Sequence, residues 1–184
     1  MIDGEEKLIA RAIRGESSAF GTLYDHYQPK IYRFVVLRVG RSEEAEDITH
    51  HVFLNAWLHI RTYENLGFPF SSWLYRIARN SVIDHYRTKR EHVSIDAIDP
   101  DVVAHPDDLE ARTDRAIEGA LVRAALATLK EEHQEVIIMR FVEELSIKEV
   151  AAAVEKTEGA IKLLQHRAIK ELKKKLGERT KAKK

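Results

Sequence analysis

Apolar residues recur along this chain at helical spacing, and no window shows the period-2 alternation that indicates a β-strand. The clearest example is segment 70–90, FSSWLYRIARNSVIDHYRTKR. At 100° per residue, one side of it carries the residues that suit a core, Leu74, Ile77, Ala78 and Ser81. The opposite side is basic, has Trp73 at its edge and carries Arg76, Arg79, Asn80, Ile83, Arg87 and Arg90. The pattern predicts an amphipathic helix here and an all-α fold for the chain.

The first half of the chain predicts a module of helices over 5–14, 17–39, 42–61 and 71–90. Ser42 and Ser71 stand at predicted helix starts, where a serine side chain can accept a hydrogen bond from a free backbone amide. Gly40 and Gly67 mark the breaks between helices.

The second half predicts a helix-turn-helix. Ser146 and Glu149 form a capping box, which begins a short helix over 147–154. A four-residue break follows, in which Thr157 is placed to cap the next helix. Two short helices joined by a tight turn are typical of a unit that places its second helix in the major groove of DNA.

A helix over 126–141 precedes this unit and begins with another predicted capping box, Thr128 to Glu131. The outer side of the last helix is basic, because residues 156–184 hold 11 basic and 3 acidic side chains. Its inner side carries Ile161, Leu164, Ala168 and Leu172. The basic side favours contact with DNA, with phosphates first and bases second.

The net charge of zero conceals a segregation of charge. Residues 1–92 carry 13 basic and 12 acidic side chains, residues 93–114 carry 1 and 7, and residues 115–184 carry 16 and 11. We predict two small helical domains, 1–92 and 115–178, joined by a flexible acidic linker over 93–114 and followed by a basic tail over 179–184. Basic ends favour a polyanionic partner.

Several classes of protein are excluded by composition. The chain has no cysteine, so it has neither disulfides nor thiolate metal sites, which agrees with a reducing, cytoplasmic location. No apolar run approaches the ~20 residues that a membrane span needs, and the acidic N-terminus is unlike a signal peptide. No HExxH motif, glycine-rich phosphate loop or pair of pocket carboxylates is evident. We therefore predict a protein that is not an enzyme and has no metal, no cofactor and no membrane insertion.

The basic side of segment 70–90 has the chemistry of a surface for single-stranded nucleic acid. Guanidinium groups bind phosphates, an amide binds a base edge, and an aromatic ring stacks on a base. The alternative is a solvated, charged helix face with no ligand.

Three stretches of the chain together resemble a bacterial RNA polymerase sigma factor of the extracytoplasmic-function class. Residues 45–60, AEDITHHVFLNAWLHI, resemble the polymerase-binding helix of that family, and segment 70–90 resembles its helix for the −10 promoter element. Residues 126–172 resemble its −35-binding domain. The resemblance implies a sigma-2 domain followed by a sigma-4 domain. It implies as partners the clamp and flap regions of core RNA polymerase, promoter DNA and an anti-sigma factor.

The resemblance also implies contacts with the polymerase clamp for Asp47, His50, His51, Phe53, Leu54, Asn55 and Trp57. The chain departs from the family at His50 and His51, where a glutamine–glutamate pair is usual. For Phe53 and Trp57 we favour a place in the core, because large aromatic residues at helical spacing are usually buried.

For the −10 element the resemblance implies a base-binding loop over 63–70 and the following helix, with the residues Asn65, Phe68, Phe70, Trp73, Arg76, Arg79, Asn80 and Arg87. For the −35 element it implies Thr157, Gly159, Lys162, Leu163, His166, Arg167 and Lys170. The chain departs from the family at Leu163 and Leu164, where a small residue and an arginine are common. We expect Leu164 to join the core and Leu163 to face outward.

Three functions fit these features: an alternative sigma factor, a stand-alone helix-turn-helix regulator, and a sigma-like decoy that binds an anti-sigma protein. The regulator would leave the 45–60 helix and the Trp73 face unexplained. Decoys of the known kind are fused to a receiver module, for which this chain has no room. The sequence therefore favours the sigma factor.

Overall fold

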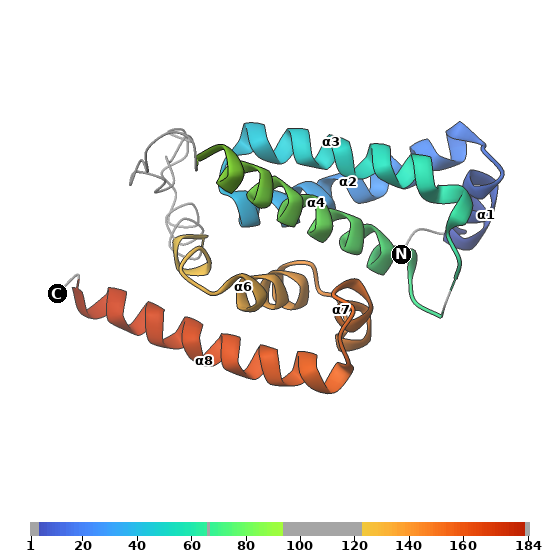
Figure 1. The fold of residues 1–184 in the computed structure, drawn as a ribbon. Helices are drawn as coiled ribbons and strands as arrows, with labels where there is room; N and C mark the ends of the chain where they lie inside the picture. Colours follow the sequence, from blue (N-terminus) through green and yellow to red (C-terminus); the bar gives the residue numbers. More distant parts are fainter. Residues whose placement is uncertain (1–3, 66, 94–122, 183–184) are drawn as a thin grey trace, which may run out of the picture.

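The computed structural model describes residues 4–65, 67–93 and 123–182, and every regular element in these ranges is helical. The prediction of an all-α fold is therefore confirmed for the described residues. The elements are α1 (Glu5–Ile13), α2 (Ser17–Val39), α3 (Ser42–His59), the short 3-10 helix η1 (Ile60–Thr62), α4 (Phe70–Val93), α6 (Glu131–Ile137), the π-helix η2 (Ile138–Val142), α7 (Ile147–Ala153) and α8 (Glu158–Ala182). Figure 1 shows their arrangement.

The first module packs α1 to α4 around a core of large side chains. Phe34 of α2 and Tyr75 of α4 are almost fully buried and pack edge to face, with ring centroids 5.5 Å apart. Gly40 ends α2 in the left-handed conformation, with φ of 79°, and its amide donates to the Val36 carbonyl at 2.9 Å. This conformation is natural for glycine, so the sharp turn from α2 into α3 follows from the residue at this position.

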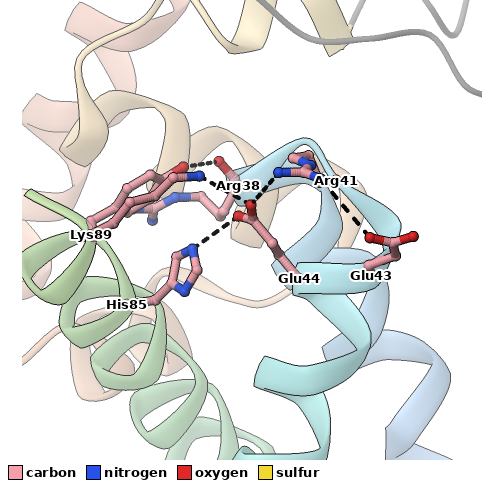
Figure 2. Close-up of polar contacts among 7 residues, drawn as sticks. Arg38, Arg41, Glu43, Glu44, His85 and Lys89 are labelled. Carbon is pink, nitrogen blue, oxygen red and sulfur yellow. Dashed lines mark hydrogen bonds and ion pairs between the residues drawn. The ribbon is translucent and has the colours of Figure 1, made fainter. Parts of the chain in front are cut away.

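A polar cluster centred on Glu44 fastens α3 to α4 (Figure 2). The Glu44 carboxylate accepts hydrogen bonds from the His85 ring at 2.9 Å, from Lys89 Nζ at 3.0 Å and from Arg41 at 3.0 Å. Close by, the Tyr86 hydroxyl donates to the backbone carbonyl of Arg38 at 2.7 Å. The cluster holds the C-terminal half of α4 against the start of α3.

The second module contains the predicted helix-turn-helix, formed by α7 and α8. The capping box at the start of α7 is present: Ser146 Oγ accepts from the Glu149 amide at 3.2 Å, and the Glu149 carboxylate accepts from the Ser146 amide at 2.7 Å. Thr157 Oγ accepts from the Ala160 amide at 3.2 Å, as predicted for the cap of α8. Ile161 is fully buried, and Leu164 packs against the core.

Three local predictions, all of helix caps, are wrong. Thr128 does not begin a capping box, because α6 begins at Glu131 and its N-cap residue is Lys130; the Thr128 hydroxyl donates to the Ala125 carbonyl at 2.8 Å. Ser42 is the first residue of α3 rather than its cap. Ser71 lies inside the first turn of α4, because that helix begins at Phe70. The backbone of α8 continues to Ala182, so most of the predicted basic tail is helical.

The two modules contact each other in this structure. Helix α7 packs against α4, and η2 contacts α2, so that α6 and α7 lie between α4 and α8 in Figure 1. The predicted linker lies outside the described residues, apart from Val93 at the end of α4. The contact between the modules bears directly on the predicted −10 surface.

Candidate nucleic-acid interface

The outer face of α3 exposes most of the residues predicted to contact polymerase. Asp47, His50, His51, Leu54 and Asn55 are all exposed, and Leu54 retains 46% of its accessible surface. An exposed leucine on this face is consistent with a partner surface, although single exposed apolar residues are common.

The two aromatic residues of this set, Phe53 and Trp57, lie on the inner side of α3, against α2. Phe53 is buried, with 4% exposure, and its ring packs on Tyr24 with centroids 4.7 Å apart. Trp57 is half-buried, and its ring centroid lies 5.0 Å from that of Phe20. Both therefore hold α3 on α2, as the favoured core interpretation predicts.

A small pocket lies where the 63–70 loop meets the first turns of α4. Phe70 is buried, and its ring contacts those of Tyr63 and Trp73, each at a centroid distance of 5.3 Å. Phe68 is 37% exposed at the rim. The pocket is lined by Tyr63, Glu64, Phe68, Pro69, Ser72, Trp73, Arg76 and, from the second module, Ala152. Rings around a hollow of this kind can stack on an unpaired base.

The loop that borders the pocket is fixed by its own side chain. Asn65 Oδ1 accepts a hydrogen bond from the Gly67 amide at 3.1 Å, and Gly67 has φ of 79°. Asn65 thus closes a turn, so its side-chain oxygen already accepts a hydrogen bond within the loop. Phe68 is carried to the pocket rim by this turn.

The arginine side chains of α4 that the structure describes are paired with carboxylates, which corrects the expectation of an open basic side. Arg79 Nε lies 2.9 Å from Glu135 Oε1, and the Arg79 side chain is only 21% exposed. Arg76 Nη1 lies 3.5 Å from Glu155 Oε1. Both glutamates belong to the second module. Further along α4, Asn80 and Arg87 are exposed, and Arg87 pairs with Asp84 at 3.3 Å.

The outer face of α8 has no such cover. Every residue predicted for the −35 element is exposed: Thr157, Gly159, Lys162, Leu163, His166, Arg167 and Lys170. Leu163 keeps 50% of its surface accessible, as expected of an outward-facing residue. Within the described part of the chain no ion pair involves these side chains. The face therefore presents separate positive charges to a phosphate backbone.

Sequence reasoning missed three residues that shape these surfaces. Leu58 on α3 is 63% exposed and extends the apolar part of the outer face. Ser72 lines the pocket, and its buried Oγ has no hydrogen-bond partner among the described residues. Glu135 is almost fully buried between the modules. Helical periodicity marks Leu58 as outward, but it carries no signal for a residue such as Glu135 that is buried by another domain.

The described residues contain neither a group of three or more histidine and acidic side chains that could hold a metal ion nor a helix long and apolar enough to cross a membrane.

In comparison with known proteins, each module matches a family of its own. Residues 23–92 match the family described as Sigma-70 region 2, and residues 125–174 match Sigma-70, region 4. The first match contains α3, the loop and α4, and the second contains the helix-turn-helix.

Curated relatives are similar over nearly the whole chain. The ECF RNA polymerase sigma factor BldN of Streptomyces coelicolor is 39% identical over 172 residues, which are 90% of this chain and 63% of BldN. SigD of Mycobacterium bovis is 31% identical, and the match covers 91% of this chain and 82% of SigD. SigW of Bacillus subtilis is 29% identical, with 93% and 96% covered. This chain thus spans less than two thirds of BldN but most of the other two.

Two solved structures share the fold. CnrH in complex with the cytosolic domain of CnrY superimposes with a TM-score of 0.73 at 23% identity, covering 95% of this chain and 97% of CnrH. The sigma factor RpoE in complex with the anti-sigma factor NepR from Bartonella quintana gives a TM-score of 0.70 at 22% identity, covering 86% and 96%. At these identities the likeness shows the fold alone.

Proposed function

Because this chain belongs to the extracytoplasmic-function class of RNA polymerase sigma factors, we propose that it is an alternative sigma factor. In this role it binds core RNA polymerase, recognises the −35 and −10 elements of a promoter and promotes DNA melting. One observation carries the proposal beyond family membership. An aromatic pocket with the Arg76 guanidinium in its lining lies at the 63–70 loop and α4, and an open helix-turn-helix face lies on α8.

The outer face of α3 is the proposed polymerase surface. Asp47 and Asn55 offer polar contacts, Leu54 offers an apolar one, and His50 and His51 replace the usual polar pair. Phe53 and Trp57 support this face from below, since they pack against α2. We add Leu58 to this surface, because the side chain of this large apolar residue is 63% exposed.

The pocket and the outer side of α4 are the proposed site for the −10 element. Tyr63, Phe68 and Trp73 supply ring faces for a base that leaves the duplex, and Asn80 supplies an amide. Phe70 shapes the pocket, Asn65 holds its loop, and Arg76, Arg79 and Arg87 bind phosphates. Extruding a base costs a few kcal/mol, so its capture must contribute a comparable amount.

The outer face of α8 is the proposed reader of the −35 element. Lys162, Arg167 and Lys170 are placed for phosphates, and His166 and Leu163 for base edges and thymine methyl groups. Gly159 has no heavy atom within 4 Å of where a Cβ would lie, so the backbone can approach DNA closely there. Thr157 already caps the helix and adds a second contact at its positive end.

An anti-sigma factor is the further partner that we propose. CnrH and RpoE were each solved with another protein, the cytosolic domain of CnrY and the anti-sigma factor NepR. A chain that acts with polymerase, a promoter and such a regulator works in the cytoplasm. The proposed role requires no catalytic chemistry of the chain itself. The stand-alone regulator remains the second candidate, because the helix-turn-helix face is open without polymerase.

Transcription in vitro with purified core polymerase on a library of genomic fragments tests the function. The proposal predicts run-off products that depend on this chain and whose templates share two short motifs at fixed spacing. No product with core polymerase, together with tight sequence-specific duplex binding by the chain alone, would favour the stand-alone regulator.

A further inference from the structure

The carboxylate at the start of α1 is buried, although glutamate side chains mostly extend into water. Glu5 is the first residue of α1 and is 7% exposed, whereas the next residue, Glu6, is exposed. Its Oε1 accepts a hydrogen bond from the hydroxyl of Tyr27, a residue of α2 that is 4% exposed. Burial and the hydrogen bond to Glu5 raise the pKa of Tyr27, so the hydroxyl keeps its proton and remains a donor. The pair therefore joins α1 to α2 inside the first module.

The ring of Tyr27 belongs to a cluster of four aromatic rings, which we call the ring cluster: Tyr27, Phe70, Tyr63 and Trp73. The centroids of Tyr27 and Phe70 lie 5.8 Å apart. The Phe70 centroid lies 5.3 Å from that of Tyr63 and 5.3 Å from that of Trp73. Tyr63 and Trp73 lie 5.2 Å apart and both line the pocket. Because packed rings have few favourable arrangements, a shift of one ring moves the others.

Helix α1 also lies against the base of the pocket loop. It contacts η1, which ends one residue before Tyr63, and Figure 1 shows α1 at the end of the module where α3 passes into the loop. The Tyr63 amide donates to the Ile60 carbonyl at 3.1 Å, which ties this ring to η1. Burial and, after it, the charge of Glu5 raise the pKa of Tyr63. Glu5 is therefore close to a ring of the pocket lining and bonded to the ring cluster that supports it.

We propose that Glu5 is a positioning residue for base capture: through Tyr27 it holds the ring cluster in the arrangement that receives an unpaired base. Glu5 does not line the pocket, so it acts through the rings and not by contact with DNA. The proposal rests on the function proposed above, because it takes the pocket to be the site for a base of the −10 element.

The hydrogen bond gives the ring cluster a direction that apolar packing alone lacks. Burial of apolar surface is non-directional, so it holds the rings together without fixing one arrangement. A hydrogen bond between two buried polar groups requires a defined geometry and carries a penalty when it is broken. Loss of the bond therefore widens the range of positions open to Tyr63 and Trp73, and a base finds the stacking geometry less often.

The test measures promoter melting by the chain assembled with core polymerase. Glu5→Ala removes the acceptor, and Glu6→Ala is the matched control, because it removes an exposed carboxylate from the same turn of α1. Permanganate reactivity of thymines gives the rate of open-complex formation on a duplex promoter. The same rate is measured on promoters that lack the base at one position of the −10 element, each position and strand in turn. The position at which the missing base slows the wild type is the captured one.

On the intact promoter, Glu5→Ala should melt the duplex about tenfold more slowly than the wild type, the effect of about one lost hydrogen bond. Glu6→Ala should match the wild type. On the promoter without the captured base, Glu5→Ala and the wild type should melt at the same rate, because no base is left to position. A normal rate for Glu5→Ala on the intact promoter would overturn the proposal. An equal defect on both promoters would also overturn it, since it would show a merely structural role.

A second pair of variants separates positioning from stability. Glu5→Ala leaves the Tyr27 hydroxyl buried and unpaired, so it should also lower the free energy of unfolding. Glu5→Ala/Tyr27→Phe removes both partners and should regain most of that loss in urea denaturation, yet it should melt the promoter as slowly as Glu5→Ala. Glu5→Gln keeps an oxygen that accepts from Tyr27 and should melt within about twofold of the wild type. Recovery of melting together with stability in the double variant would contradict the positioning role.

Failure of the proposed function has its own signature in this experiment. If no missing base in the −10 element slows the wild type, the chain captures no base, and the role of Glu5 falls with base capture. If a missing base slows the wild type but Glu5→Ala melts the intact promoter normally, base capture stands and only the role of Glu5 is wrong. Circular dichroism and affinity for core polymerase should be unchanged in every variant, because the polymerase surface lies on α3.

Discussion

Helices α4 and α8 each carry a basic face, but the two faces lie in opposite environments. On α8 every predicted DNA-contacting residue is exposed, whereas on α4 Arg79 and Arg76 are paired with glutamates of the other module. An amphipathic pattern shows which side of a helix avoids its own core. It does not show whether water, DNA or a second domain of opposite charge covers that side.

The difference has a consequence for binding by the free chain. Under the proposed function, the α8 face is open to duplex DNA as it stands, whereas Arg76 and Arg79 of α4 must leave their glutamate partners before they can bind phosphates.

The largest expected effect comes from removing the support beneath the α4 pocket. Phe70→Ala deletes a ring that is 2% exposed and contacts three other aromatic rings, those of Tyr27, Tyr63 and Trp73. It should lower the free energy of unfolding by about 3–5 kcal/mol, as measured by urea denaturation. Phe141→Ala, which truncates a ring that is 54% exposed in the other module, should cost far less. Equal losses would contradict the assigned packing.

The next effect concerns assembly with polymerase, which should not depend on either DNA face. Asp47→Ala/Asn55→Ala removes two exposed polar groups from α3, so the fold should be intact. Polar contacts of this kind are worth about 1–3 kcal/mol each when a partner group is left unpaired. Surface plasmon resonance with core polymerase should show at least a tenfold loss of affinity. Glu46→Ala on the same helix is the control, and an unchanged affinity in the double variant would remove both residues from the interface.

A smaller effect distinguishes the two basic faces directly. Lys162→Ala and Lys170→Ala should each lower the salt dependence of duplex binding by the free chain by about one unit of slope. Arg79→Ala should leave that slope unchanged, because Glu135 already neutralises Arg79. Fluorescence anisotropy at several salt concentrations measures all three slopes. An equal change for Arg79 would mean that the α4 face is open in the free chain.

The smallest expected effect is the pH dependence of the Glu44 cluster. Burial alone would raise the pKa of Glu44, but hydrogen bonds from Lys89 and His85 outweigh it and lower the pKa below its usual 4.5. A carboxylate whose pKa is lowered on folding stabilises the fold above its unfolded pKa, and this stabilisation is lost as the pH falls through the folded pKa.

Glu44→Gln should therefore reduce stability by about 1 kcal/mol at pH 7, and the difference from wild type should vanish in strong acid. Urea denaturation of both proteins at several pH values from pH 7 down to strong acid measures this difference in the free energy of unfolding. Glu46→Gln, an exposed neighbour on α3, is the matched control and should show little change at any pH. A pH-independent deficit in Glu44→Gln would mean that packing rather than charge is lost.

Local signals allowed most of the fold to be predicted from the sequence. The capping box at Ser146 and the cap at Thr157 depend on contacts three residues apart, so their motifs are readable in the chain itself. The box at Thr128 is absent because α6 begins at Glu131 with Lys130 as its N-cap, so Thr128 lies two residues before the capping position. Helix bounds were close because core periodicity and glycine breaks agreed.

The site was predictable as residue types and faces, but not as an arrangement in space. Leu163 was expected to face outward and Phe53 inward, and both do. The pairing of Arg33 with Glu143 joins residues 110 positions apart, for which no periodicity or motif gives a signal. The pairing of Arg79 with Glu135 could not be predicted for the same reason.

Permanganate footprinting of unpaired thymines tests most directly whether the α4 pocket captures a base during promoter melting. The chain and core polymerase would be assembled on a duplex promoter and on the same promoter mismatched across the −10 region. Asn80→Ala and Phe68→Ala should form closed complexes normally, lose reactive thymines on the duplex and recover transcription on the mismatched template. Normal melting of the duplex by both variants would contradict base capture and leave α4 as a charged face without that role.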